Sequence, residues 1–367
     1  MTGVGRVGVG LIGAGNISDQ YLQNLTSFPD VEVLFVADID TARAAEQAQK
    51  YEVPGSGTVD ELLEHPGIEI VVNLTVPAVH VDVAMRVLAA GKNVWTEKPM
   101  ALDRESADAL LAEAAARNLR VATAPDTFLG AGLQAGKRLI EGGSIGTPLT
   151  AIVEFQSAGP EPWHPNPDFF YVTGGGPLFD MGPYYLTTLV QNLGPVARVA
   201  ATSSVASAER TIGSGPRAGE RIPVEVATQV SALLEFESGA SAQASFSFQS
   251  AMPRHLVEIS GTAGTLVFPD PNTFDGELRL WSSGMPEPET IATTSLGGRG
   301  TGVVELARAI RADVPERASG QQARHVLDVM VSILEAAGTG QYVAVQSTMA
   351  PAESLPEGWD PRAATLS

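Results

Sequence analysis

The first third of the chain alternates between short apolar runs and segments with helical spacing. Five runs rich in valine, isoleucine and leucine are separated by helical patterns, with only short connections between them. Such alternation is typical of a parallel sheet with helices on both faces, since each crossover returns the chain to the same edge. The pattern predicts a doubly wound α/β domain over residues 1–124. The expected strands are residues 7–12, 31–36, 68–74, 93–96 and 119–123.

The period of the pattern changes after Pro125. Apolar residues, with Thr228 as the one polar exception, occupy every second position in residues 224–236 and 242–248. This two-residue period predicts an α+β domain, residues 125–350, whose mostly antiparallel sheet is open on one face. The C-terminal helices either belong to this domain or pack back on the first. Further expected elements are strands at 149–156, 256–260, 278–281 and 342–345, helices at 131–141, 303–312 and 321–336, a loop insertion at 203–223, and a loosely held arm at 351–367.

The composition restricts the classes of function. The chain has 367 residues, 44% of them hydrophobic, and no cysteine, which excludes disulfides, thiolate metal sites and cysteine nucleophiles. The five histidines are scattered, so no metal site is expected. The net charge of −19 argues against nucleic acids and anionic membranes as partners. No apolar run approaches the length of a membrane span and no signal segment is seen, so a cytoplasmic protein is expected.

A glycine turn joins the first expected strand to the first helix. Gly13 permits the tight turn, and Gly15 leaves out the side chain that would keep a phosphate from the backbone amides. The helix that begins near Asn16 and Ile17 directs its positive end toward that phosphate. Asp38 ends the next apolar run, where its carboxylate can accept from both hydroxyls of a ribose. Together these residues predict a dinucleotide site.

The acidic residue favours NAD over NADP. The carboxylate of Asp38 repels the 2′-phosphate of NADP, whereas Arg43 nearby leaves NADP binding open. The third glycine of the G-x-G-x-x-G pattern is replaced by Ser18. Serine is still small enough for close packing of helix against strand, so the motif is expected to function.

Two further strands end in segments that carry chemistry. Thr75, Pro77 and His80 follow one of them and are expected to line the cofactor, although a lone helical histidine is more often structural. Glu97 and Lys98 follow the next strand. Because open α/β sheets bind ligands at the carboxyl ends of their strands, Lys98 is expected near the reacting centre. There it can hold a substrate hydroxyl or help to carry its proton.

The second domain contains a glycine run followed by an acid and a tyrosine. The glycines 174–176 let the backbone approach a ligand, although a flexible loop has the same composition. Asp180 and Tyr184 are four residues apart and share one face of a helix. The aromatic segment upstream either contacts a carbohydrate or buries its rings as a rigid connector. Its candidate substrate contacts are Trp163, His164 and Tyr171.

The combination of these segments resembles one family of oxidoreductases. The glycine turn, T-x-P-x-x-H, E-K-P and G-G-G-x-L-x-D-x-G occur in the order seen in the glucose–fructose oxidoreductase and inositol dehydrogenase (Gfo/Idh/MocA) family. The resemblance covers nearly the whole chain. It implies a Rossmann domain, an open-faced sheet domain, and oxidation or reduction of a sugar or cyclitol with a nicotinamide cofactor. Lys98 and Asp180 match the family's lysine and aspartate.

The chain departs from the family four residues after Asp180. Family members usually carry a histidine there as the acid and base for the reacting hydroxyl, whereas this chain has Tyr184. A tyrosine titrates at about 10 and is a poor base at neutral pH unless a cation such as Lys98 lowers its pKa. Three interpretations stay open: Tyr184 is the acid and base, it only binds substrate while Lys98 and Asp180 relay the proton, or the site is non-catalytic or has an altered chemistry. His164 is the best substitute for the absent histidine.

The sequence predicts an NAD(P)-dependent dehydrogenase that transfers hydride between nicotinamide and a secondary alcohol of a sugar, sugar derivative or cyclitol. Two other functions remain open. One is an enzyme that retains NAD and cleaves glycosides by oxidation, elimination and reduction. The other is a ligand-sensing protein without turnover, against which the intact Glu97, Lys98 and Asp180 argue. The open sheet face predicts a homo-oligomer.

Overall fold

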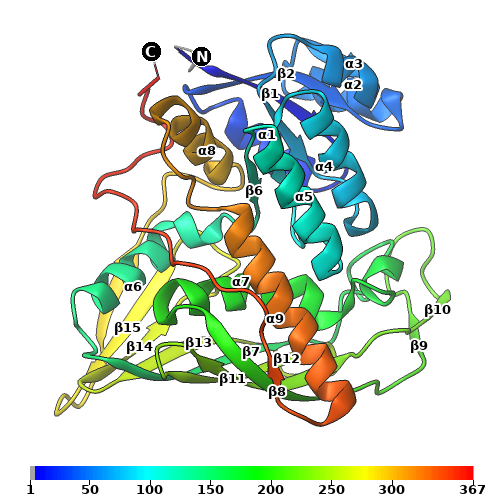
Figure 1. The fold of residues 1–367 in the computed structure, drawn as a ribbon. Coiled ribbons are helices and arrows are strands. Elements are labelled where there is room, and N and C mark those ends of the chain that lie inside the picture. The colour runs from blue at the N-terminus through cyan, green and yellow to red at the C-terminus, as the bar shows by residue number, and fades with distance from the viewer. Residues whose placement is uncertain (1–4, 367) are drawn as a thin grey trace. The chain divides into compact units, whose positions relative to one another are not determined.

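The computed structural model describes residues 5–366, which form two compact units (Figure 1). The first unit takes in the chain up to Gly130, residues 295–324, and the chain from Ala352 onward. The second unit comprises residues 131–294 and 325–351. Each unit is therefore assembled from segments that are far apart in the sequence. Within the described residues, no helix combines the length and apolar character that crossing a membrane requires.

A parallel sheet of six strands forms the core of the first unit, which confirms the predicted doubly wound sheet. The strand order is β3-β2-β1-β4-β5-β6, so the chain builds outward from β1 first in one direction and then in the other. The ends of β1 and β4 meet at this reversal, which is where doubly wound sheets bind their ligands. The strands are β1 (Val7–Ile12), β2 (Val31–Ala37), β3 (Gly55–Gly57), β4 (Ile70–Asn73), β5 (Asn93–Thr96) and β6 (Val121–Thr123).

Helices connect these strands, and α2, α3 and α5 begin at residues whose side chains cap them. The Asp103 carboxylate accepts from the Ser106 amide and caps α5. Thr58 and Glu61 form a reciprocal capping box at α3. The helices of this unit are α1 (Ser18–Leu25), α2 (Thr41–Lys50), α3 (Val59–Glu64), α4 (His80–Ala89), α5 (Arg104–Ala116) and, from the later segment, α8 (Thr301–Ala312).

The C-terminal segment lies on the first unit without forming a helix or strand. The buried carboxylate of Asp30 accepts from the Thr365 amide at 2.8 Å, although 335 positions separate the two residues. Asp30 also pairs with Arg308 at 2.7 Å, and Arg308 donates to the Asp360 carbonyl oxygen at 2.9 Å. The expectation that this arm is loosely held is therefore not met. Its sequence has no periodic pattern because polar contacts, and not an apolar face, hold it.

A nine-stranded sheet forms the second unit. All neighbouring strands are antiparallel except β7 and β12, and the order is β16-β15-β14-β13-β7-β12-β11-β8-β17. The two alternating runs of the sequence form β11 and β12, which pair with each other. The strands are β7 (Pro148–Gln156), β8 (Val196–Ser204), β11 (Gln229–Phe236), β12 (Ser241–Ser247), β13 (Arg254–Gly261), β14 (Gly264–Phe268), β15 (Gly276–Ser282), β16 (Glu289–Thr293) and β17 (Val343–Ala344).

Helices cover only one face of this sheet. α7 (Gly176–Leu193) packs on β7, β11 and β12, and α6 (Ala131–Glu141) packs on β14, β15 and β16. α9 (Gly320–Thr339) begins in the first unit and continues in the second. Leu234 on the helix side of β11 is buried, whereas its neighbour Leu233 is 49% exposed. This alternation confirms the predicted sheet with one packed and one open face.

Residues 203–228 differ from the expectation. The region predicted as a loop insertion contains a two-stranded hairpin, β9 (Glu209–Thr211) and β10 (Arg221–Pro223). The start of the predicted strand at 224 does not join β11. Its Glu225 amide donates instead to the Tyr171 carbonyl oxygen at 2.8 Å. The alternation of apolar residues therefore extends beyond the strand, because this stretch packs on another loop.

Candidate functional site

The turn after β1 requires glycine at its first position. Gly13 has a positive φ of 102°, and a Cβ atom there would lie 2.8 Å from the backbone of Leu74. Any other residue would be strained by both conditions. Gly15 differs, because no atom lies within 4 Å of the position of its Cβ. A side chain at Gly15 would therefore occupy open space, and this is the space that a ligand on the turn would need.

The backbone amides that follow this turn are available to a ligand. Within residues 5–366, the amides of Gly15, Asn16 and Ile17 form no hydrogen bond. Ser18 closes the turn, since its amide and its hydroxyl both donate to the Gly15 carbonyl oxygen, at 3.0 and 2.6 Å. Serine is thus accommodated at the third position of the motif. The open donors at the start of α1 fit an anion such as a pyrophosphate.

Asp38 follows β2 and bonds directly to the glycine turn. One carboxylate oxygen accepts from the Ala14 amide at 2.7 Å, and the other accepts from the Asp40 amide and pairs with Arg43 at 2.6 Å. Burial alone would raise the pKa of Asp38. The hydrogen bonds from Arg43 and the two amides outweigh burial, so the pKa lies below its ordinary value of 3.8. The adjacent Ile39 is 97% exposed, an apolar surface that the sequence pattern did not single out.

His80 holds together the loops that follow β4 and β5. Its Nδ1 lies 2.8 Å from the Pro99 carbonyl oxygen, and its Nε2 lies 2.9 Å from the Thr75 carbonyl oxygen. The ring is 1% exposed, and this burial lowers the pKa of His80 despite the two carbonyl oxygens. Thr75 also donates its hydroxyl to Asn73 at 2.7 Å, and Pro77 begins a short 3₁₀ helix. Both ring nitrogens of His80 are therefore occupied by backbone, and its role is to join the two loops.

Glu97 and Lys98 follow β5 on a support of buried aromatic residues. The Tyr21 hydroxyl donates to the Glu97 carboxylate at 2.8 Å and accepts from the Trp95 indole at 3.1 Å. The second Glu97 oxygen accepts from the Lys98 amide at 3.0 Å. Burial, with the charge of Glu97, raises the pKa of Tyr21, so this hydroxyl stays neutral and keeps donating. The backbone at Lys98 is thereby anchored to the core of the first unit.

Asp126 is a buried carboxylate that the sequence pattern does not single out. Its Oδ2 accepts from the amides of Gly300 and Gly302 at the start of α8, at 2.8 and 3.1 Å. Arg299 lies 3.8 Å from Oδ1, which accepts no hydrogen bond from the described residues. Burial outweighs these attractions and raises the pKa of Asp126 to about 6. No local pattern signals this site, because 174 positions separate the acid from its first amide partner.

The glycine run before α7 makes close contacts with its own chain. A Cβ atom at Gly175 would lie 2.6 Å from backbone atoms of Phe169 and Phe170. One at Gly176 would lie 2.8 Å from the Ala227 carbonyl oxygen, and Gly176 has a positive φ of 79°. These glycines allow three segments of the second unit to meet. The structure thus gives them a packing role in addition to the ligand contact expected from sequence.

Asp180 and Tyr184 lie one turn apart on α7, as their spacing predicts. Tyr184 is 5% exposed, and Asp180 is half-buried. Burial lowers the pKa of His164, while the charge of Asp180 opposes that shift. The Asn166 amide donates to Nδ1 of His164 at 3.1 Å, so the proton of the neutral ring is on Nε2. The second unit therefore brings His164 within electrostatic range of Asp180.

The aromatic residues of the upstream segment divide into exposed and buried ones. Trp163 is 66% exposed and meets the His164 ring edge-on, with centroids 5.5 Å apart. Tyr171 is fully buried and donates its hydroxyl to Glu161. The sequence predicts Tyr171 as a substrate contact. In the structure its side chain is buried and instead supports the segment through Glu161.

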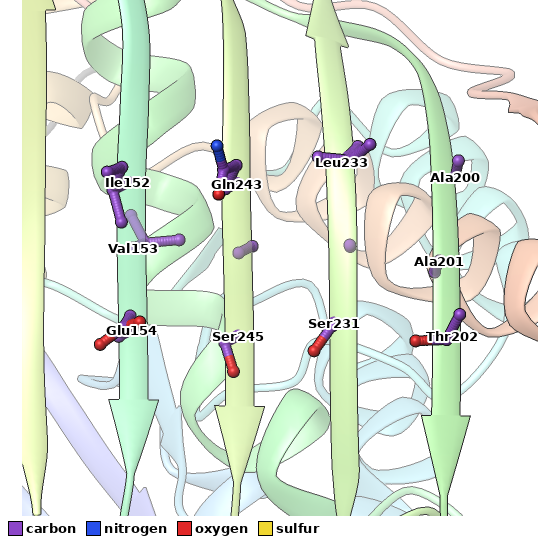
Figure 2. Close-up of a pocket in the computed structure, with 12 residues that line it drawn as sticks. Ile152, Val153, Glu154, Ala200, Ala201, Thr202, Ser231, Leu233, Gln243 and Ser245 are labelled. Atoms are coloured by element: carbon purple, nitrogen blue, oxygen red, sulfur yellow. The ribbon is translucent and has the colours of Figure 1, made fainter.

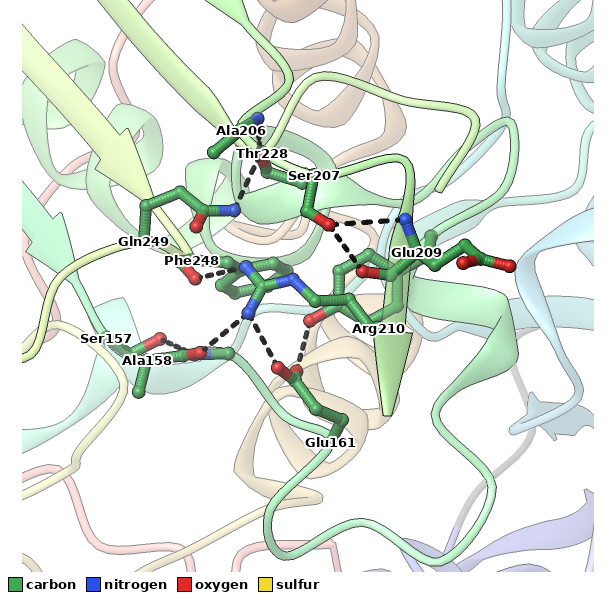
Figure 3. A network of polar contacts seen from close by, with 12 residues as sticks. Ser157, Ala158, Glu161, Ala206, Ser207, Glu209, Arg210, Thr228, Phe248 and Gln249 are labelled. Atoms are coloured by element: carbon green, nitrogen blue, oxygen red, sulfur yellow. Dashed lines mark hydrogen bonds and ion pairs between the residues drawn. The ribbon is translucent and has the colours of Figure 1, made fainter. Parts of the chain in front are cut away.

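A buried ion pair, which the sequence pattern does not reveal, also supports this segment. Arg210 on β9 pairs with Glu161 at 2.7 Å and donates to the Phe248 carbonyl oxygen at 2.6 Å (Figure 3). The side chains of Arg210 and Glu161 are 14% and 9% exposed. The guanidinium also lies over the Tyr171 ring, 5.6 Å from its centroid. The hairpin that appeared as a loop insertion in the sequence thus contributes a charge to the interior of the second unit.

The strand order, the glycine turn and its open amides define a dinucleotide-binding protein with a second, sheet-based unit. Two family models match the chain. The oxidoreductase family with NAD-binding Rossmann fold matches residues 7–124, and the GFO/IDH/MocA C-terminal domain matches residues 133–267. The chain belongs to the Gfo/Idh/MocA family of NAD-binding oxidoreductases, which confirms the resemblance drawn from its motifs.

Characterised relatives include trans-1,2-dihydrobenzene-1,2-diol dehydrogenase. The chain is 29% identical to the enzyme of Mus musculus over 259 residues, which are 70% of this chain and 72% of that enzyme. It is 32% identical to the enzyme of Homo sapiens over 178 residues, which are 48% of this chain and 52% of that enzyme. The chain therefore spans about half the length of the human relative.

Solved structures share the whole fold. Levoglucosan dehydrogenase in complex with NADH and L-sorbose aligns with a TM-score of 0.81 at 21% identity, over 94% of this chain and 100% of that chain. An NAD binding oxidoreductase from Klebsiella pneumoniae aligns with a TM-score of 0.79 at 23% identity, over 93% and 99% of the two chains. At this level of identity the likeness establishes the fold.

Proposed function

We propose that the protein uses NAD to oxidise a secondary alcohol of a sugar, sugar derivative or cyclitol, or catalyses the reverse reduction. The observation that carries the proposal is the set of open amides at the start of α1, together with the anchored Glu97–Lys98 segment at the end of β5. By their names, the relatives act on a diol and on levoglucosan. The test is NADH formation, followed by absorbance, with NAD and a panel of sugars, cyclitols and their acids.

The residues of the first unit fit NAD. The amides of Gly15, Asn16 and Ile17 would hold the pyrophosphate, and Asp38 would accept from a ribose hydroxyl. The exposed Ile39 offers an apolar surface to the adenine ring. When bound, NAD supplies the acceptor for the hydride. The further contacts proposed from the sequence are Gly13, Thr75, Pro77, Glu97 and Lys98, with His80 acting through the loops that it joins.

We propose a preference for NAD over NADP. Asp38 is ionised, and its interaction with Arg43 occupies the nearest cation at 2.6 Å. A 2′-phosphate would therefore meet a carboxylate whose counter-charge is already engaged. Steady-state kinetics with both cofactors test this. A higher kcat/KM with NADP would contradict the assignment of Asp38.

For the hydroxyl proton, we propose Tyr184 as the acid and base, with Lys98 and Asp180 assisting. His164 is less suited to accept a proton, because its Nδ1 is engaged by the Asn166 amide and its Nε2 carries hydrogen. His164 can instead donate to a substrate oxygen. Tyr184→Phe separates the alternatives. A fall in kcat of about 100-fold or more supports proton transfer by Tyr184, whereas a higher KM with an unchanged kcat supports substrate binding alone.

We also propose that the open sheet face is a contact between copies of the chain. A shallow depression of about 410 Å³ crosses β7, β12, β11 and β8 on this face (Figure 2). Leu233 is 49% exposed there and Ile152 is 36% exposed, so this face offers apolar side chains that a second copy can cover. The Leu233→Asp variant is expected to lower the mass measured by light scattering. A wild-type protein that is monomeric at micromolar concentration would contradict the proposal.

A further inference from the structure

The segment that carries the exposed aromatic residues has almost no regular structure of its own. Residues 157–175 connect β7 to α7 and contain only the short 3₁₀ helix Asp168–Phe170. Trp163 is nevertheless presented at 66% exposure, and Phe169, at 40% exposure, lies against Phe170 with ring centroids 4.0 Å apart. A segment without a helix or strand needs outside support to keep side chains in a fixed position. We call the exposed surface of Trp163, His164 and Phe169 the aromatic platform.

The β9–β10 hairpin provides this support through two ion pairs, at positions of the segment that flank Trp163 and His164. Arg210 pairs with Glu161 at 2.7 Å, before the platform. Arg217, in the turn of the hairpin, forms a two-point contact at 2.6 and 3.0 Å with Asp168, which follows Trp163 and His164 in the sequence. A bidentate contact between guanidinium and carboxylate fixes orientation as well as distance. Arginines of the same hairpin thus hold the segment on both sides of Trp163 and His164.

Backbone contacts bring the hairpin turn directly against the segment. The Gly213 amide donates to the Glu161 carbonyl oxygen at 2.8 Å. A Cβ atom at Gly213 would lie 2.9 Å from Pro162, and one at Gly215 would lie 2.6 Å from Pro165. Both positions therefore need glycine for the hairpin to lie this close. The hairpin turn thus lies directly against Glu161, Pro162 and Pro165.

Arg210 also connects the hairpin to the sheet. It donates to the carbonyl oxygens of Phe248, after β12, and of Ala158, after β7 (Figure 3). Arg210 thereby fixes the position of the segment relative to the ends of β7 and β12. The 3₁₀ helix Asp168–Phe170 of this segment packs against α7, and the charge of Asp180 on α7 acts on His164. A shift of the hairpin would therefore move the platform relative to Asp180.

We propose that the β9–β10 hairpin is the element that sets substrate selectivity, with Arg210 and Arg217 as positioning residues for the aromatic platform. This inference rests on the proposed function. The exposed indole offers a flat surface that matches the C–H face of a pyranose or cyclitol ring, and an acyclic polyol has no such face. The hairpin therefore favours cyclic over acyclic polyols.

The test compares Arg210→Met and Arg217→Met with the matched control Arg221→Met. Arg221 lies in the same hairpin, but its pair with Glu209 is exposed and contacts no part of the platform. For Arg210→Met and Arg217→Met we expect a KM for a cyclic polyol that is raised about tenfold, a kcat within about threefold, and a reduced preference for cyclic over acyclic substrates. Arg217→Lys is expected to recover part of the loss, and Arg221→Met is expected to match the wild type.

Hydrogen exchange measured on the same proteins separates this inference from the proposed function. Amides of residues 160–171 are expected to exchange at least about tenfold faster in Arg210→Met, while those of β11 and β12 keep wild-type protection and so report an intact fold. Unchanged exchange in residues 160–171, or faster exchange with unaltered KM and selectivity, would overturn the inference. The wild type could also fail to oxidise any polyol with NAD while the hairpin variants still loosen the segment. That result would overturn the proposed function and the role in selectivity, and would leave only the structural support of the segment by the hairpin.

Discussion

Replacement of Asp126 by asparagine tests the electrostatics of the first unit. Burial raises the pKa of this carboxyl to about 6, and its Oδ2 accepts from the amides of Gly300 and Gly302. Asparagine has a similar shape and keeps a carbonyl oxygen for these amides, but it has no charge at any pH. The variant therefore isolates the cost of ionising this one group inside the protein.

The expected sign follows from the linkage of protonation to folding. In the unfolded chain Asp126 titrates near its ordinary value of 3.8, so between 3.8 and about 6 the folded state holds a proton that the unfolded state has lost. Protonation thus stabilises the fold at low pH, and this contribution disappears as the pH rises through about 6. A shift of about two pKa units corresponds to a total change of ~3 kcal/mol in the free energy of unfolding. Of this change, ~1.4 kcal/mol is lost between about pH 5 and about pH 7.5.

The assay is the free energy of unfolding from urea titrations of wild type and Asp126→Asn at these two pH values. Between the lower and the higher pH, the wild type is expected to lose ~1.4 kcal/mol relative to the variant. Asp103→Asn is the matched control, because Asp103 caps α5 from an exposed position. Its difference from wild type is expected to be equal at both pH values. A pH-independent difference for Asp126→Asn, or one of opposite sign, would refute the reasoning.

Three further substitutions test the site and its supports. Gly13→Ala is expected to destabilise the fold by about 1–3 kcal/mol, because Gly13 has a positive φ and lies against Leu74. Gly15→Ala is expected to keep the stability of the wild type but to weaken NAD binding. Thermal unfolding and a cofactor titration distinguish the two variants. Equal losses of stability would contradict this reading of the turn. Tyr21→Phe removes the donor to Glu97 and is expected to cost about 1–3 kcal/mol of unfolding free energy, with circular dichroism in urea as the measurement and wild-type stability as the contrary result. Asp30→Ala leaves Arg308 buried without its carboxylate and is expected to lower the unfolding free energy by about 3–5 kcal/mol. Carboxypeptidase is also expected to trim the C-terminus of this variant faster. Unchanged trimming would show that other contacts hold the segment.

Local patterns in the sequence predict most elements of the fold. The apolar runs correspond to β1, β2, β4, β5 and β6, and the expected helix at 131–141 is α6 with the same bounds. No strand was predicted at β3, β8, β14 or β16. The hairpin was missed because β9 and β10 have only three residues each, too few for a period to be seen.

Residues that act through distant partners could not be recognised from the sequence. The roles of Asp126 and Arg210 depend on partners 174 and 49 positions away, and no spacing rule connects them. The glycine turn, E-K-P and the Asp180–Tyr184 pair were found because each is a local motif with its own chemistry. Their assignment to one reaction stays a prediction. The burial of Tyr171 shows that the sequence of an aromatic segment does not reveal which of its rings are exposed.

The central claim, NAD-dependent oxidation of a cyclic alcohol with the participation of Lys98, is tested most directly by deuterium transfer. A cyclic polyol that carries deuterium on the reacting carbon is incubated with NAD and enzyme, and the NADH formed is analysed by mass spectrometry. The account predicts that the wild type yields deuterated NADH, and that Lys98→Met, compared at saturating NAD, forms deuterated NADH at least about 100-fold more slowly. Unlabelled NADH, no NADH with any cyclic polyol, or a wild-type rate for Lys98→Met would contradict it.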